Sequence, residues 1–149
     1  MYTISVTFLH FFMFNIFFWP MFIVVSVVAV LHSVAIDQAY YWTLPWYDIM
    51  MHFLGGVWLA FFIFWIHATK PLPFKLGVAQ VLLFVIGVGL LWEAYELFFK
   101  MTFVSDPEYP FDTSLDLVMD TLGGVVTFVI SKFLFLRGKT ETSIDSSHV

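Results

Sequence analysis

Four long apolar stretches alternate with short polar segments along the chain. The stretches lie within residues 3–36, 49–68, 76–99 and 115–136. Each is long enough for a membrane-spanning helix, which needs about 20 mainly apolar residues. The first exceeds one span but is too short for two, so we place its spanning part at about residues 16–36. The pattern predicts an all-α integral membrane bundle of four transmembrane helices.

The polar segments define the predicted domain organisation. Residues 1–137 are expected to form a single transmembrane domain, because the linkers between spans are too short for a second one. Residues 138–149 are polar, rich in Ser and Thr and without periodicity, so we expect a disordered tail. The chain is therefore expected to be one compact bundle with a short polar extension.

Composition supports a membrane protein and excludes several functions. The chain is 61% hydrophobic and 21% aromatic, and only 11% of its residues are charged, which leaves too few polar side chains for a soluble surface. It contains no cysteine, which excludes disulfides and thiolate chemistry. With only six Lys and Arg it has no basic face for nucleic acid.

Cationic and acidic residues separate to opposite ends of the predicted helices. The cationic residues at the end with both termini are Lys70, Lys75, Lys132, Arg137 and Lys139, and only Lys100 lies at the other. By the positive-inside rule we expect a plasma (inner) membrane protein with both termini cytoplasmic. The carboxyl residues at the outer end are Asp37, Asp48, Glu93, Glu96, Asp106, Glu108, Asp112, Asp116 and Asp120.

An internal repeat carries part of this acidic group. The segment from Asp48 to Val57 opens the second span, the segment from Asp116 to Val125 opens the fourth, and six of their ten positions are identical. Both segments run in the same direction, which favours two repeated helical hairpins related by an axis along the membrane normal. In each, an acidic residue and a second polar residue at i+4 share one helix face.

The candidate site gathers at the outer end of spans two, three and four. An Asp at a helix N-terminus commonly acts as a cap, which is an alternative explanation for Asp48 and Asp116. Polar residues deeper in a span are costly and usually face the bundle interior. Hydrogen bonding between helices is the alternative structural role for these. The candidate site residues are Asp48, His52, Glu93, Glu96, Asp116 and Asp120, with Asp112 and His32 as outer-shell candidates.

These motifs resemble those of the VanZ-like membrane proteins. The matching series is Asp48-x-x-x-His52-Phe, Trp92-Glu93-x-x-Glu96 and Asp112-Thr-x-x-Asp116-Leu-x-x-Asp120-x-x-Gly123. VanZ-type proteins more often have Glu-x-x-Gln at the second motif, so the chain is more similar to the YjdF-type branch. The resemblance spans about residues 45–136 and implies an inner-membrane protein of four to five helices. VanZ itself is associated with glycopeptide resistance, which we do not transfer to this chain.

Three functions would relieve the repulsion within such a cluster. A bound divalent metal ion (Mg²⁺, Mn²⁺, Ca²⁺ or Zn²⁺) would act on lipid or envelope headgroups. Shared protons would serve a proton-coupled transporter or acid–base chemistry. Recognition without chemistry would make the chain a binding or assembly subunit. We expect a bound metal ion and no organic cofactor. As partners we expect membrane lipids and either a second copy of the chain or a membrane complex. Whether the chain is an enzyme stays open.

Overall fold

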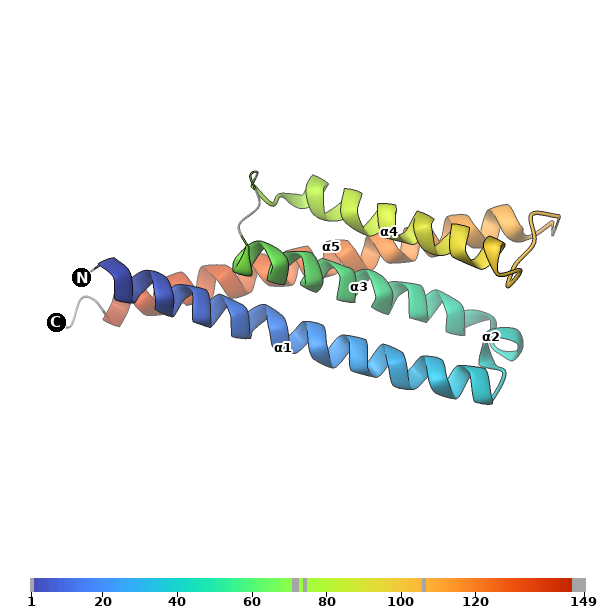
Figure 1. The fold of residues 1–149 in the computed structure, drawn as a ribbon, viewed down its shortest axis with the longest axis horizontal. Coiled ribbons are helices and arrows are strands. Elements are labelled where there is room, and N and C mark those ends of the chain that lie inside the picture. Colours follow the sequence, from blue (N-terminus) through green and yellow to red (C-terminus); the bar gives the residue numbers. More distant parts are fainter. Residues whose placement is uncertain (1, 71–72, 74, 106, 146–149) are drawn as a thin grey trace.

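The fold is a bundle of long helices, as the apolar pattern predicts. The computed structural model describes residues 2–70, 73, 75–105 and 107–145, and side chains within residues 16–133. Its elements are α1 (Tyr2–Asp37), α2 (Tyr40–Thr43), α3 (Pro45–Thr69), α4 (Val78–Phe98) and α5 (Tyr109–Asp145). The long helices run alternately up and down, and α2 caps one end (Figure 1).

The prediction of four spans is confirmed for the described residues. The helical segments long and apolar enough to cross a membrane are Ile16–Asp37, Pro45–Thr69, Val78–Phe98 and Tyr109–Phe133. Large apolar side chains such as Leu83 and Phe133 are exposed on the outside of the bundle, as lipid contact requires. Helix α5 continues to Asp145, past residue 138, where we expected the tail to start. The disorder of residues 138–149 and the domain boundary at residue 137 stay predictions.

Helix α3 occupies the centre of the bundle. It packs against α1, α4 and α5, and α5 also packs against α4. Buried apolar residues fill these contacts in three groups, one of which combines Leu59 and Ala60 of α3 with Val81 and Val85 of α4. Near the α2 end, the Tyr47 hydroxyl donates to the Leu31 carbonyl at 2.9 Å and ties α3 to α1.

The two repeated segments are where α3 and α5 cross. A Cβ added to Gly56 would lie 2.1 Å from the Asp120 carbonyl oxygen, and one added to Gly123 would lie 2.2 Å from the Phe53 carbonyl oxygen. Both distances are far below van der Waals contact, so only glycine allows this approach. The crossing therefore holds the polar residues of both segments against each other.

Candidate metal site at the α3–α5 crossing

His52 lies at the centre of three aspartates. Its side chain is 8% exposed, and Nε2 lies 3.9 Å from Oδ1 of Asp48, one turn earlier on α3. The same nitrogen lies 3.9 Å from Oδ1 of Asp116 on α5. The other ring nitrogen, Nδ1, lies 3.4 Å from Oδ2 of Asp120, one turn further along α5. The imidazole thus connects two helices through both of its nitrogens.

The arrangement follows from the sequence repeat. Asp48 and Asp116 occupy the first position of the two segments, and both face Nε2 of His52. His52 and Asp120 occupy the fifth position, and they face each other through Nδ1. Because the glycines bring the two helices so close, equivalent positions meet across the crossing. The first of these two positions is Asp in both segments, and the fifth is His in one and Asp in the other, which gives this group of four side chains one imidazole.

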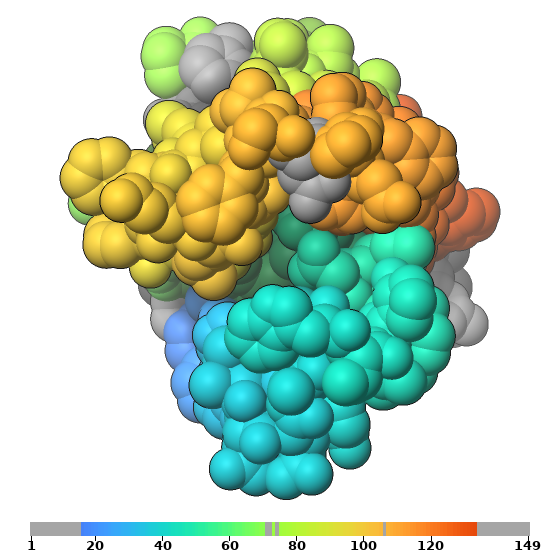
Figure 2. Space-filling model, turned by 90° about the vertical axis from the view of Figure 1, so that its right-hand side faces the viewer, coloured from blue at the N-terminus to red at the C-terminus, as the bar shows by residue number. Residues whose placement is uncertain are grey.

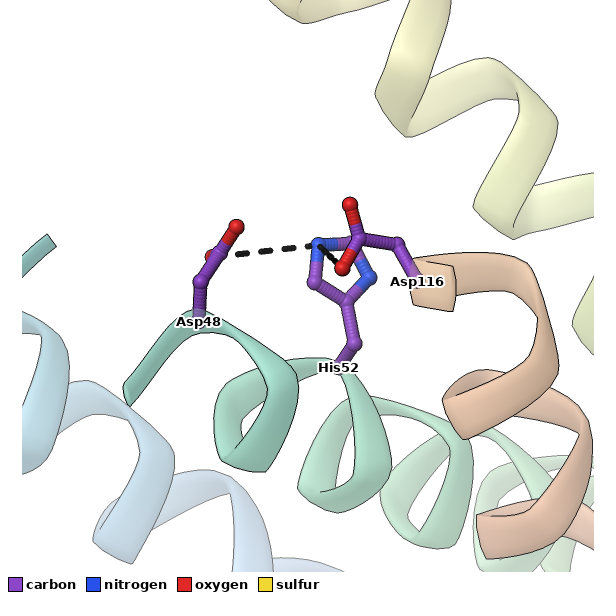
Figure 3. A group of neighbouring side chains, drawn as sticks. All are labelled: Asp48, His52 and Asp116. Atoms are coloured by element: carbon purple, nitrogen blue, oxygen red, sulfur yellow. Dashed lines mark ion pairs between the residues drawn. The ribbon is translucent and has the colours of Figure 1, made fainter. Parts of the chain in front are cut away.

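Three of these side chains fit a metal ion. Their ligand atoms, one each from Asp48, His52 and Asp116, lie within 4.8 Å of one another. Figure 3 shows Asp48 and His52 rising from α3 and the Asp116 carboxylate above the ring. Two ligands of one ion at about 2.0–2.2 Å can be at most about 4.4 Å apart. A small inward movement of the side chains would therefore close the set around an ion.

Asp120 is placed to orient the ring of His52. A metal-bound imidazole usually donates its second N–H to a carboxylate, which fixes the tautomer and the ring plane. Asp120 is 4% exposed. Its Oδ2 would lie 2.6 Å from a Cβ on Gly89, so the missing side chain at position 89 of α4 makes room for this carboxylate. Helix α4 thereby covers the side of the cluster that faces away from Nε2.

Glu93 is buried beside the cluster on α4. It is 5% exposed, and its Oε2 accepts a hydrogen bond of 2.7 Å from the Thr113 hydroxyl of α5. Neither Glu93 Oε1 nor Asp116 Oδ1, both buried, has a hydrogen-bond partner among the described residues. A buried carboxylate oxygen without a partner is costly. Both oxygens are acceptors that a bound cation would satisfy.

The remaining candidates lie around this centre. Glu96 is half-buried and accepts a hydrogen bond of 2.8 Å from the Trp92 indole nitrogen. Asp112 is exposed in the first turn of α5. His32 is paired with the Tyr41 hydroxyl at 2.8 Å. The cluster therefore has a centre of Asp48, His52 and Asp116, and the ligand roles of Glu93, Glu96 and Asp120 stay predictions.

Sequence reasoning missed Tyr41. Its half-buried side chain on α2 pairs with His32. Burial raises the pKa of Tyr41 to about 12, and the charges of Asp48 and Glu96 act in the same direction. Tyr41 is thus an uncharged ring within electrostatic reach of carboxylates on α3 and α4. No spacing in the sequence indicated this electrostatic influence, since α2 and α4 are far apart in the chain.

Comparison with known families gives the chain its relatives. The model of DUF2238, described as a predicted membrane protein family, matches residues 2–137. The chain belongs to the DUF2238 family. The matched range contains all four spans and the whole cluster, so this DUF2238 protein is a multi-pass membrane protein. Searches of curated proteins and of solved structures found no match.

Proposed function

We propose that this DUF2238 protein binds one divalent metal ion through Asp48, His52 Nε2 and Asp116, and that the ion acts on lipid or envelope headgroups. The observation that carries the proposal is the arrangement around the imidazole. One nitrogen faces two carboxylates, while the other faces a third carboxylate suited to orient the ring. Hydrogen bonding between helices alone would explain one such contact, but not a buried Asp116 Oδ1 that lies 3.9 Å from Nε2 and accepts no hydrogen bond from the described residues.

The imidazole of the donor set favours Zn²⁺ over Mg²⁺ or Ca²⁺, and its two carboxylates also suit Mn²⁺. Imidazole is a good ligand for Zn²⁺, whereas Mg²⁺ and Ca²⁺ prefer oxygen throughout. Three protein ligands leave a coordination position open, as in catalytic rather than structural sites. An ion with an open position can polarise a phosphoryl or carbonyl oxygen. The cluster lies at the end of the spans, where headgroups of a surrounding bilayer would be.

Metal content is the first test. Protein purified in mild detergent without chelator is expected to carry close to one Zn²⁺ or Mn²⁺ per chain, measured by elemental analysis. Protein stripped with chelator should take up the same amount when the ion is returned. A preparation that carries no metal, and binds none when both ions are offered, would contradict the proposal. Proton-coupled transport or assembly with a membrane partner would then be the better explanation for the cluster.

Membrane orientation is a separate expectation. We propose that the chain lies in the plasma (inner) membrane with both termini in the cytoplasm, because five of the six cationic residues lie at that end in the sequence. A reporter fused after Val149 should then be cytoplasmic, and one inserted near Pro107 should be external. The reverse pattern would mean that the cluster lies at the cytoplasmic face, next to different headgroups.

A closer relationship within the family is also proposed. The order of the Asp-His, Glu-x-x-Glu and Asp-Thr-x-x-Asp motifs supports kinship with VanZ-like proteins and with the YjdF-type branch in particular. These motifs include every residue of the proposed metal centre. If the kinship holds, proteins of that branch are expected to bind the same ion.

A further inference from the structure

The connection between α4 and α5 begins with large apolar side chains that are exposed. Figure 2 looks onto the end of the bundle that carries this connection, which appears there in yellow to orange. Four of the six residues from Phe99 to Val104 are large and apolar. Their exposed fractions are 57% for Phe99, 53% for Met101, 57% for Phe103 and 68% for Val104. An exposed apolar surface of this kind marks contact with a protein partner or with a membrane.

The lipid-facing surfaces of both helices lead into this connection. On α4, the exposed side chains of Leu83, Leu91 and Phe98 follow one another at intervals of about two helical turns, so they share one face. On α5, the exposed side chains of Phe111 and Val118 repeat this interval. The apolar surface therefore continues from one span through the connection into the next. Lipid covers this surface along the spans, and the continuity favours lipid as the partner of the connection as well.

The backbone at the end of α4 is suited to a place without water. The Met101 N–H donates to the Glu96 carbonyl at 2.9 Å, and the Lys100 N–H donates to the Leu97 carbonyl at 3.2 Å. This is the Schellman arrangement, which satisfies the last carbonyls of a helix from its own backbone. It requires a left-handed residue, and Lys100 has a φ of 58°. Because lipid offers no hydrogen bonds to free backbone groups, a helix end closed in this way can enter a bilayer.

The start of α5 is also partly closed by its own chain. The N–H groups of Phe111 and Asp112 both donate to the Glu108 carbonyl at 3.0 Å. Pro110, in the first turn, has no N–H to satisfy. Fewer free N–H groups therefore remain than the four that a helix start normally leaves. Both ends of the connection thus lower the cost of contact with lipid.

We propose that residues 99–104 insert into the interface of the bilayer leaflet at this end of the bundle, with Met101, Phe103 and Val104 among the acyl chains and Lys100 at the lipid phosphates. A lysine beside an apolar surface extends its ammonium group to the phosphates in this way. The exposed indole of Trp42 on α2 lies at the same end, as side chains at a membrane interface do. The partner of the connection is therefore phospholipid.

Insertion fixes how the cluster meets the membrane. Phe111 and Asp116 lie on the same helix, about 7 Å apart along its axis at roughly 1.5 Å per residue. With the connection in the interface, the cluster lies next to the lipid headgroups, and molecules reach it from the bilayer. This consequence for the substrate rests on the proposed metal function, whereas the insertion itself does not need a metal ion.

Spin labels on single cysteines test the insertion. The chain has no cysteine of its own, so the full-length variants Phe103→Cys and Val104→Cys carry one label each. In phosphatidylethanolamine–phosphatidylglycerol vesicles, collisions with oxygen, which dissolves in lipid, are compared with collisions with a water-soluble nickel chelate. Both labels should favour oxygen several-fold more than a label at Gln38→Cys, which is exposed and outside the spans. They should match a label at Leu91→Cys, on the lipid-facing side of α4.

An added charge makes the result specific. Phe103→Glu in the Val104→Cys protein places a carboxylate where we expect acyl chains, so nickel collisions at the label should rise several-fold. Gln38→Glu adds the same charge at an exposed position away from the connection and should leave the label unchanged.

Three outcomes separate the alternatives. Labels in the connection that meet nickel as often as the Gln38→Cys label would overturn the proposal, because water would then cover this surface. Labels hidden from both reagents and broadened by a second label would also overturn it, because a second copy of the chain would cover the surface. Labels in lipid on a protein that binds no metal would support the insertion and contradict only the proposed function.

Discussion

Replacing His52 by alanine is expected to abolish tight metal binding. The imidazole is the one nitrogen ligand of the proposed centre and lies between the carboxylates of Asp48 and Asp116. Without it, two carboxylates from different helices remain, and no group links them. The affinity for Zn²⁺ should therefore fall by more than the roughly 10- to 100-fold that is lost when only an outer partner of a ligand is removed. Competition against a zinc indicator in detergent measures the change.

Two further variants make this result specific. Asp120→Asn keeps the size of the side chain but removes the charge that faces Nδ1, so affinity should fall by about 10-fold, less than for His52→Ala. His67→Ala removes another imidazole from α3, near the opposite end of the helix, and should leave affinity unchanged. A folded His52→Ala protein with wild-type affinity would rule out the centre. An Asp120→Asn protein that matches His67→Ala would rule out the orienting role.

The apolar pattern was enough to predict four spans, but the helix starts were less accurate. The segments before spans two and four were read as linkers, whereas α3 begins at Pro45 and α5 at Tyr109. Proline is favoured in the first helical turn, where its missing N–H is not needed. Pro45 and Pro110 were therefore start signals that the prediction did not use. The acidic residues that follow, Asp48 and Asp112, lie in the first turns of their helices.

The repeat predicted which residues of the cluster would meet. Spacing of i and i+4 placed Asp48 with His52 on one helix face and Asp116 with Asp120 on another. The sequence could not assign each ring nitrogen of His52 to its own carboxylates, because that depends on the rotation of α3 against α5. It also could not show that Gly89 makes room for Asp120, since α4 has no counterpart of the repeat.

The crossing of α3 and α5 that forms the site also limits how far the spacing between these two helices can change. A tight helix approach is normally a matter of packing alone. Here the residues in contact with the glycines are Asp120 and the backbone next to His52, so a change in spacing between α3 and α5 must also change the distances between the proposed ligands. Substitutions at these glycines are therefore expected to change stability and metal affinity together, whereas substitutions elsewhere are expected to change one without the other.

Alanine at Gly56 or Gly123 is the sharpest test of that coupling. The added Cβ would lie 2.1 Å and 2.2 Å, respectively, from a backbone oxygen of the other helix, and backbone cannot move aside as a flexible side chain can. We expect each variant to lose about 1–3 kcal/mol of unfolding free energy through overpacking. Gly87→Ala, on α4, meets nothing within 4 Å and should be neutral or slightly stabilising, because alanine favours helix.

Unfolding in detergent titrated with denaturing surfactant, followed by circular dichroism, measures these stabilities, and the zinc competition is repeated on the folded fraction. Gly56→Ala and Gly123→Ala should bind Zn²⁺ more weakly than Gly87→Ala, because the separated helices carry Asp116 and Asp120 away from His52. If both variants are as stable as Gly87→Ala, the close crossing is wrong. If they are destabilised but bind Zn²⁺ with wild-type affinity, the crossing is right and the metal ligands lie elsewhere.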